Sequence, residues 1–545
     1  MPTLDWIGKK AVVNHHREVP YRLIHCDGAL SAGDPDAGNL LVQGDNLEAL
    51  KALLPYYAGK VKCIYIDPPY NTGNEGWVYN DNVASPEIKA WLGKVVGKEA
   101  EDLSRHDKWL CMMYPRLRLL REFLREDGAV FISIDDDENH RLRMMLDEIF
   151  GSQNFVATLV WQKKYAPAND AKYFSDDHDY VIVYARSKTQ WSPNKIARSA
   201  AQDDKYKNPD HDPRGRWQSD NYTSNKNKQE RPNGWYSVKN PNTGEEIWPS
   251  PTAVWRYPEE TYRKHVDDNR IYWGVSGVNS TPRYKRFLFE VGGIVPRTVL
   301  LHGDVGHNQA AKRQILEIFH GQSEVFATPK PSTLIQRILE IGSAHGDLIL
   351  DTFAGSGTTG HAVLNLNKQD SGNRQFILVE MDESIAPGIT AERLRRVIKG
   401  YDKSGDPEKP VEPLGGGFRY CRLGTPLFNE FGDIDGGVIF SDLAAHVFFS
   451  ETGSPLPNKV DGSSHFIGIH KEKAVYLLFS PAEQGFAREA SGNVLTPDAL
   501  ANLPAPSNDF EGVRVVYAEG CTVSSERLKA EGVIFKQIPY QIEGN

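Results

Sequence analysis

The segment Asp67-Pro68-Pro69-Tyr70 brings together residue types that could activate an amine. An amine conjugated to a purine or pyrimidine ring is a poor nucleophile, because its lone pair is delocalised into the ring. The Asp67 carboxylate and the Pro68 carbonyl could accept its two N–H bonds, draw the nitrogen toward sp³ geometry and favour attack on a sulfonium methyl group. The prolines stiffen the turn, and Tyr70 could stack on a base rotated out of its helix. A rigid surface turn without chemistry is the alternative interpretation.

A glycine-rich turn supplies a second set of candidate residues. It lies between a predicted strand and a predicted helix and reads Asp351-Thr352-Phe353-Ala354-Gly355-Ser356-Gly357-Thr358-Thr359-Gly360. Glycines let the backbone approach a ligand closely, and a helix N-terminus offers free N–H groups. The turn therefore predicts a nucleotide-like ligand, with a tight turn that binds nothing as the alternative.

The residues around this turn exclude one other kind of nucleotide site. A phosphate-binding loop needs a Lys after its last glycine, whereas Gly360 is followed by His361 and Ala362. Glu380 ends the next predicted strand, where its carboxylate could accept hydrogen bonds from both hydroxyls of a ribose.

The hydrophobic pattern predicts the elements that must hold these two turns. Short apolar runs alternate with stretches of helical periodicity, which is typical of an α/β fold with a parallel sheet. Ligands bind such sheets outside the carboxyl ends of the strands, and both turns stand at such ends. The predicted strands are 40–42, 61–66, 129–134, 155–161, 180–184, 347–350 and 376–379. The predicted helices start near 47, span 109–125, follow 135–137 up to about 150, span 332–341 and end near 366.

The chain is long enough for several structural units. At 545 residues it exceeds what one hydrophobic core supports, so two to four units are expected. The middle of the chain loses the alternation and is rich in Asn, Pro, Gly, Trp and Tyr, which indicates an inserted loop-rich or β-rich unit. We expect an N-terminal segment at 1–39, the first half of an α/β core at 40–186, the insertion at 187–323, the second half of the core at 324–401, a linker at 402–417 and a small mixed α/β C-terminal domain at 418–545.

Charge and composition limit the partners and the compartment. The net charge of −9 hides a basic stretch between Arg186 and Lys239, which fits a localised footprint for a polyanion. No apolar run is long enough for a membrane span and no leader-like apolar segment opens the sequence, so we expect a cytoplasmic protein with no membrane partner. The five Cys show no C-x-x-C pair, which disfavours a disulfide framework and a zinc site. Asp135-Asp136-Asp137 lacks calcium-loop spacing, so no metal site is predicted.

Together, these motifs resemble the amino-methyltransferases of bacterial DNA modification. Asp67-Pro68-Pro69-Tyr70-Asn71-Thr72-Gly73 precedes Phe353-Ala354-Gly355-Ser356-Gly357-Thr358-Thr359, which is the permuted order of the β class of these enzymes. The resemblance is greatest to the modification subunits of type III restriction systems and covers about 40–399 apart from the basic middle. It rests further on Gly44-Asp45-Asn46-Leu47, Ile64-Tyr65-Ile66-Asp67, Ile134-Asp135-Asp136 and Ala327-Thr328-Pro329-Lys330-Pro331.

The resemblance implies a Rossmann-like, S-adenosylmethionine-dependent methyltransferase core with circularly permuted motif order. Its catalytic residues would be Asp67, Pro68, Pro69 and Tyr70. Its cofactor-binding residues would be Asp45 near the adenine, Lys330 and Pro331 near the methionine end, and also Asp351, Phe353, Ala354, Gly355, Ser356, Gly357, Thr358, Thr359 and Glu380.

The resemblance also makes the insertion at 187–323 a target-recognition domain. Its aromatic residues alternate with Arg and Lys, as on many nucleic-acid surfaces. An aromatic core of a small β domain is the alternative interpretation of most of these rings. They are Trp217, Tyr222, Trp235, Tyr236, Trp248, Trp255 and Tyr257.

The predicted activity is that of a site-specific, adenine-specific DNA methyltransferase. After base flipping, a methyl group would pass from S-adenosylmethionine to the exocyclic N6 amine of adenine in double-stranded DNA. The enzyme would serve a restriction-modification system or act as an orphan modification enzyme. A homodimer and a restriction (helicase–nuclease) subunit are the protein partners that the resemblance allows, and the C-terminal domain could serve either association.

Several alternatives to this activity stay open. Methylation of cytosine at N4 uses the same loop, although Asp rather than Ser at position 67 favours adenine. A non-catalytic DNA-binding subunit of a restriction complex is a second alternative, and an RNA or protein methyltransferase is a third. Methylation of a cytosine ring carbon is disfavoured, because that chemistry needs a Cys nucleophile, usually after Pro, and no Cys here follows Pro.

Overall fold

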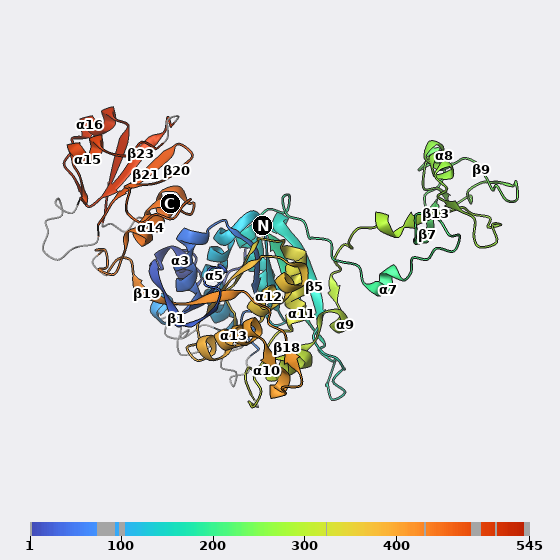
Figure 1. Ribbon diagram of the computed structural model, residues 1–545, viewed down its shortest axis with the longest axis horizontal. Coiled ribbons are helices and arrows are strands. Elements are labelled where there is room, and N and C mark those ends of the chain that lie inside the picture. The colour runs from blue at the N-terminus through green and yellow to red at the C-terminus, as the bar shows by residue number, and fades with distance from the viewer. Residues whose placement is uncertain are drawn as a thin grey trace. The chain divides into compact units, whose positions relative to one another are not determined.

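The computed structural model describes residues 3–72, 93–97, 104–322, 324–429, 432–480, 492–506 and 510–538 (Figure 1). The chain divides into two compact units: Met1–Pro193 together with Arg297–Asn545, and Asn194–Pro296. The second unit lies within the predicted insertion. Residues 297–322 fold with the first unit instead, because β14 (Val299–Leu300) pairs with a strand of its sheet. Gly73, the last residue of the first motif, lies outside the described residues.

A ten-stranded sheet forms the centre of the first unit. Strands β1 and β6 run antiparallel to their neighbours and the other neighbouring strands pair parallel. The inner strands are nearly continuous apolar runs, as expected of a sheet that helices cover on both faces. The order across the sheet is β1 (Arg22–Gly33), β19 (Gly417–Pro426), β2 (Leu40–Gln43), β16 (Gln375–Glu380), β15 (Leu348–Asp351), β3 (Val61–Ile66), β4 (Leu124–Ile134), β6 (His178–Ala185), β5 (Phe155–Gln162) and β14.

Helices pack on this sheet through alternate residues of its strands. Ile64 and Ile66 of β3 belong to the core that contains α3 (Asn46–Tyr57) and α5 (Arg105–Phe123). Cys63 points the other way, toward α11 (Ser332–Gly342), where a Cβ on Gly342 would lie 3.0 Å from its sulfur. Other helices of the first unit are α1 (Lys9–Val12), α2 (His15–Glu18), α6 (Asn139–Leu146), α9 (His302–Val305), α10 (Asn308–Ile318), α12 (Thr358–Asp370) and α13 (Glu392–Lys399).

The predicted alternation of strands and helices is confirmed, and the sheet takes in two segments that were expected outside it. Strand β1 comes from the predicted N-terminal segment, and β19 begins at the predicted linker and runs into the predicted C-terminal domain. Their pairing joins residues about 400 positions apart, which no local pattern reveals. It also sets Cys26 opposite Cys421, and these two form a disulfide that the sequence analysis had disfavoured.

The remainder of the C-terminal part is mixed α/β, as predicted. Strands β21, β23 and β25 are parallel, β20 is antiparallel, and α14 packs against the sheet. The elements are α14 (Phe440–Thr452), β20 (Phe466–His470), β21 (Lys473–Leu478), β22 (Val494–Leu495), α15 (Pro497–Ala501), β23 (Val513–Ala518), β24 (Gly520–Cys521), α16 (Ser525–Ala530) and β25 (Val533–Gln537).

The second unit is loop-rich with short strands, as the sequence indicated. A three-stranded antiparallel sheet is its largest regular element. Among the described helices of the whole chain, none is long and apolar enough to cross a bilayer. A cytoplasmic location stays a prediction. The main elements of the unit are α7 (Ala200–Asp203), β7 (Trp217–Asn221), β8 (Thr223–Ser224), β9 (Val238–Lys239), β10 (Glu246–Ile247), β11 (Val254–Trp255), α8 (Glu259–Asp267), β12 (Ile271–Tyr272) and β13 (Arg283–Phe287).

Candidate active site

The two sequence motifs meet at one edge of the sheet. Strands β3 and β15 are parallel neighbours, with Ile64 beside Leu350. Their carboxyl ends therefore point the same way, so Asp67 follows one strand next to Asp351, the last residue of the other. In doubly wound sheets, ligands bind at such an edge, where the connections diverge to opposite sides.

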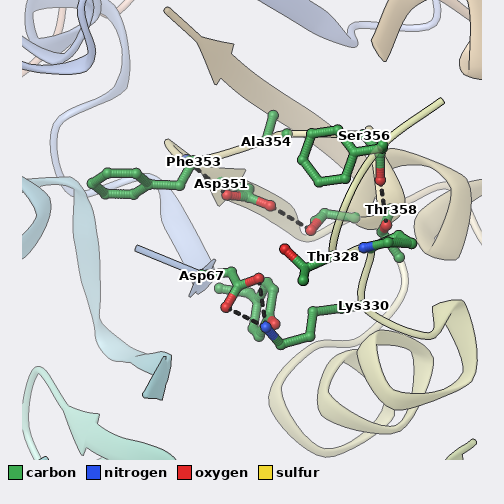
Figure 2. Close-up of a pocket in the computed structure, with 13 residues that line it drawn as sticks. Asp67, Thr328, Lys330, Asp351, Phe353, Ala354, Ser356 and Thr358 are labelled. Atoms are coloured by element: carbon green, nitrogen blue, oxygen red, sulfur yellow. Dashed lines mark hydrogen bonds and ion pairs between the residues drawn. The ribbon is translucent and has the colours of Figure 1, made fainter. Parts of the chain in front are cut away.

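The Asp67 carboxylate is held by Lys330 (Figure 2). Lys330 Nζ lies 2.7 Å from Asp67 Oδ1 and 2.8 Å from Oδ2. The same ammonium lies 4.6 Å from the centre of the Tyr70 ring, within cation–π range. Burial raises the pKa of Asp67 above its ordinary value, while Lys330 opposes that shift. The ion pair therefore favours the charged form of a carboxyl group that burial alone would keep protonated.

The loop that carries Asp67 is fixed from behind by buried side chains. Trp109 Nε1 donates a 2.6 Å hydrogen bond to the carbonyl of Pro69. Asn71 adopts a φ of 62°, which Asn tolerates better than most residues, and its Nδ2 donates to Glu138 Oε1 at 2.5 Å. His106 Nδ1 contacts the same oxygen at 2.5 Å. These contacts fix the direction in which Asp67 and the Pro68 carbonyl point.

Sequence reasoning missed these positioning residues. Trp109 appeared only as the start of a predicted helix. Glu138 directly follows the acidic run Asp135-Asp136-Asp137, for which no metal site is predicted. A local signal existed for Asn71 alone, because Asn after a Pro-Pro turn suits a left-handed backbone.

The glycine-rich turn is held by Asp351. Its Oδ1 accepts the Phe353 N–H at 3.0 Å and its Oδ2 accepts the Thr359 hydroxyl at 2.5 Å. Gly355 and Gly357 have φ values of 49° and 76°, in the left-handed region that favours glycine. Burial raises the pKa of Asp351 to about 7.

Two further charged residues, both buried, hold this turn without lining the pocket beside it. Glu380 is fully buried, and its Oε2 accepts the Gly355 N–H at 2.8 Å. Arg393, also buried, donates to Ser356 Oγ at 3.0 Å and to Thr358 Oγ1 at 2.8 Å. These hydrogen bonds fix the backbone at Gly355 and the side chains of Ser356 and Thr358.

Two pockets adjoin at Asp67. The narrow pocket, with about 20 Å³ of free space, is lined by Tyr65, Asp67, Phe326, Thr328, Pro329, Lys330, Asp351, Phe353, Ala354, Gly355, Ser356, Thr358 and Thr359 (Figure 2). The wide pocket, with about 220 Å³, is lined by Asp67, Pro68, Tyr70, Thr72, Asp135, Lys163, Asp176, Asp179, Asn308, Thr328 and Lys330. Asp67, Thr328 and Lys330 belong to both linings, so they form a shared wall.

Most of the predicted site residues line one of these pockets, and five do not. Gly357 caps α12 and Pro331 precedes α11. Glu380 braces the turn as described. Asp45 caps α3 and pairs with Arg116 Nη2 at 2.7 Å. Pro69 lines neither pocket, and its carbonyl instead anchors the loop to Trp109.

The narrow pocket has the groups that suit a cationic nucleoside. It presents the Asp67 and Asp351 carboxylates, a close backbone approach at Gly355, and the aromatic rings of Phe353 and Phe326. Its free space equals about one water molecule. A ligand of nucleoside size therefore needs these side chains, or the segment before Lys330, to move outward on binding.

The chain matches the family model described as DNA methylase over residues 61–392. That range includes both motifs, both pockets and the whole second unit. The chain belongs to the DNA methylase family. Membership confirms the predicted α/β methyltransferase fold, the DNA methyltransferase activity and S-adenosylmethionine as methyl donor.

Named relatives extend the similarity of this methylase beyond its core. It is 32% identical to the StyLTI Mod subunit of a type III restriction-modification enzyme from Salmonella typhimurium, over 83% of this chain and 70% of that one. It is 33% identical to the EcoPI Mod subunit from Escherichia phage P1, over 74% and 69%. It is 30% identical to the type II methyltransferase M.KpnI from Klebsiella pneumoniae, over 65% and 83%. The resemblance to type III modification subunits is therefore confirmed.

The second unit of the methylase uses most of its predicted aromatic residues as a core. Tyr222, Tyr236 and Trp255 are buried with Trp273. Trp217 is buried as well, and Tyr257 packs against the core.

Trp235 and Trp248 are the two predicted rings left for the surface of this unit. They lie 6.0 Å apart, and Trp248 is 53% exposed. Lys228 Nζ lies 5.3 Å from the Trp235 ring. The aromatic-core interpretation is therefore confirmed for most of these rings, and a nucleic-acid surface stays a prediction for Trp235 and Trp248.

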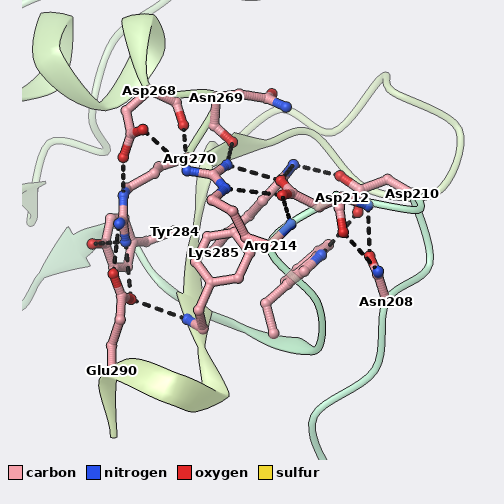
Figure 3. Close-up of polar contacts among 12 residues, drawn as sticks. Asn208, Asp210, Asp212, Arg214, Asp268, Asn269, Arg270, Tyr284, Lys285 and Glu290 are labelled. Atoms are coloured by element: carbon pink, nitrogen blue, oxygen red, sulfur yellow. Dashed lines mark hydrogen bonds and ion pairs between the residues drawn. The ribbon is translucent and has the colours of Figure 1, made fainter.

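Several cations of this unit are tied to its own carboxylates (Figure 3). Arg214 Nη2 lies 2.8 Å from Asp212 Oδ2, and Lys285 Nζ lies 3.2 Å from the same oxygen. Arg270 pairs with Glu290 at 2.5 Å. These ion pairs stabilise a small fold, and Arg214 is the one of these three cations that lies in the basic stretch between Arg186 and Lys239.

Replacing Asp351 by Asn should change how stability depends on pH. The folded carboxyl has a pKa of about 7 and an ordinary value of 3.8, so between these values the folded state keeps a proton that the unfolded state has lost. The free energy of unfolding of the wild type should fall as pH rises through this window, by up to about 4 kcal/mol at about 1.4 kcal/mol per pKa unit. Asp351→Asn should lack this part of the decline in urea unfolding.

Glu126→Gln is the control for loss of one carboxylate, because the Glu126 side chain is 61% exposed. This variant should keep the pH dependence of the wild type. An unchanged pH dependence in Asp351→Asn would contradict the buried, protonated Asp351.

Proposed function

We propose that this chain methylates the exocyclic N6 amine of adenine in double-stranded DNA, after the base has flipped into the wide pocket. The observation that carries the proposal is the position of Asp67 in the wall shared by both pockets. A methyl donor in the narrow pocket and an amine in the wide pocket would meet at this carboxylate. Flipping is required because the amine of a stacked, paired base cannot reach such a site.

S-adenosylmethionine, when bound, supplies an electrophilic methyl group. The residues Phe353 to Thr359 would hold it in the narrow pocket, which Asp67 and Asp351 also line. Lys330 would remain at the shared wall, where its ammonium neutralises Asp67. The proposed roles of Asp45 and Glu380 are then indirect, since both brace the elements around the turn.

The catalytic loop would act on the amine in three ways. Asp67 and the Pro68 carbonyl accept its two N–H bonds and direct the nitrogen lone pair toward the methyl carbon. The Tyr70 ring offers a stacking face for the base. As the N–C bond forms and the C–S bond breaks, the nitrogen loses one proton, and Asp67 is positioned to accept it because burial raises its pKa.

Adenine is favoured over cytosine because the loop begins with Asp rather than Ser. Methylation of cytosine at N4 is the second candidate within the same chemistry. The similarity to relatives named Mod subunits supports a role in a type III restriction-modification system. A homodimer and association with a restriction subunit belong to this proposal, with the C-terminal part as the candidate docking region.

The unit Asn194–Pro296 is proposed as the target-recognition domain, within the predicted range 187–323. Its support is the exposed Trp248 next to Trp235 and Lys228, which together offer a stacking face and a positive charge. Both features suit a nucleic acid. Its other aromatic residues and paired cations serve the fold of the unit.

Transfer of tritium from labelled S-adenosylmethionine to DNA tests the proposed activity. Asp67→Ala should lower incorporation by about 100-fold or more, because an electrostatic contact at the reacting nitrogen is lost. Asp67→Asn keeps one acceptor oxygen, so its tritium incorporation should lie between those of the wild type and Asp67→Ala. Asp137→Asn, a nearby exposed carboxylate, should behave as wild type. Equal incorporation by wild type and Asp67→Ala, or none by either, would refute the proposal.

Loss of the exposed tryptophan should weaken DNA binding without affecting the cofactor. Trp248→Ala should raise the Kd for a target duplex by about 5- to 100-fold at fixed salt, the usual range for one stacked ring. Phe289→Ala, which removes another exposed ring of the same unit, is the matched control. Fluorescence anisotropy measures both. Equal Kd values for Trp248→Ala and the control would argue against Trp248 as a DNA contact.

A further inference from the structure

The loop between β5 and β6, residues 163–177, exposes aromatic rings that the fold does not use. Tyr173 is 82% exposed, Phe174 is 94% exposed and Tyr165 is 66% exposed. Single exposed apolar residues are common on protein surfaces, but adjacent rings exposed to this degree form a patch that suggests a binding partner. Strands β5 and β6 pair directly, so the loop leaves the sheet and returns to it as an extension, beyond β5 in the view of Figure 1.

Hydrogen bonds order the base of this loop. The Lys163 N–H donates to the Asp177 carbonyl at 2.8 Å, and the Asn308 N–H donates to the Lys163 carbonyl at 3.0 Å. Higher in the loop, the Ala168 N–H donates to Ser175 Oγ at 2.7 Å. The rings are thus presented on a braced support, which lowers the entropic cost of binding through them.

The same loop borders the wide pocket. Lys163 and Asp176 line that pocket together with Asp67 and Tyr70. Lys163 Nζ joins the two sides of the loop, at 2.9 Å from Asp176 and 2.7 Å from Asp179. The exposed rings are therefore carried by the segment that forms the rim of the pocket proposed for the flipped base.

We infer that Tyr173 and Phe174 insert into the DNA duplex and fill the gap that the flipped adenine leaves. This inference rests on the proposed function. Flipping costs the stacking and pairing of one base, a few kcal/mol, and apolar side chains can act as wedges between base steps. Aromatic rings stack on any base, so such a wedge carries no sequence preference.

The loop carries three Lys and three Asp residues and has no net charge, so only the position of its cations bears on the partner. Lys172 Nζ lies 5.2 Å from the Tyr173 ring, so the exposed rings carry a cation beside them. Lys164 adds a second positive side chain at the start of the loop. Phosphate contacts from such residues would position the rings without reading the sequence.

The test compares the double variant Tyr173→Ala/Phe174→Ala with wild type on two unmethylated duplexes. Both contain the sequence that the wild type methylates. One has a normal target pair and the other a mismatched target base, which is cheaper to flip. On the normal duplex, kcat/KM of the variant should fall by about 10- to 100-fold. On the mismatched duplex, the loss should shrink to about threefold or less, since less flipping cost has to be offset.

A second readout follows flipping itself. With 2-aminopurine at the target position, the wild type should raise the fluorescence strongly and the variant weakly, while the Kd for S-adenosylmethionine stays the same. Ile439→Ala, which removes an exposed apolar side chain elsewhere on the first unit, should match wild type in every assay.

The other outcomes are distinct. Equal loss on both duplexes, or no loss, would overturn the wedge. A change of oligomeric state in the variant with unchanged flipping would assign the rings to a protein interface and would also overturn it. If wild type methylates no DNA at all, the proposed function fails. Methylation by wild type with an unaffected variant refutes only the wedge.

Discussion

The parallel pairing of β3 with β15 is the constraint on which the site depends. Chain order separates the two motifs by most of the core, and only this pairing brings the ends of both strands to one edge. Once the strands are neighbours, Asp67 and the glycine-rich turn must face a common space. The permuted motif order changes only the connections between the two halves of the core. The ends of β3 and β15 still meet at one edge, so a chain with this motif order can carry the same methyl-transfer site.

The charged side chains of the site are buried and paired with hydrogen-bond donors. Asp67 pairs with Lys330, Asp351 with Thr359, and Glu380 with the Gly355 N–H. A buried charge without a partner would cost several kcal/mol, so each carboxylate near the pockets needs such a contact. Trp109 and Glu138 in turn hold the catalytic loop before any ligand binds.

The sequence predicted the parts of the fold that local patterns determine. The strand before Asp67 could be predicted because its apolar run stops at two prolines, and the glycine-rich turn because its glycines begin a helix. Contacts between distant segments were beyond such patterns. No spacing reveals that β19 inserts between β1 and β2, that Lys330 reaches Asp67, or that Glu380 is buried behind the turn. In the second unit, composition could not separate the core rings from the exposed Trp248, because both kinds of aromatic residue share one segment.

Nucleoside mass spectrometry tests the central claim most directly. Plasmid DNA from a methylation-deficient host that expresses this chain would be digested to nucleosides and compared with DNA from the same host without the chain. The account predicts N6-methyldeoxyadenosine as the new product. N4-methyldeoxycytidine as the only new product would contradict the adenine assignment, and the absence of any methylated nucleoside would contradict the proposed chemistry as a whole.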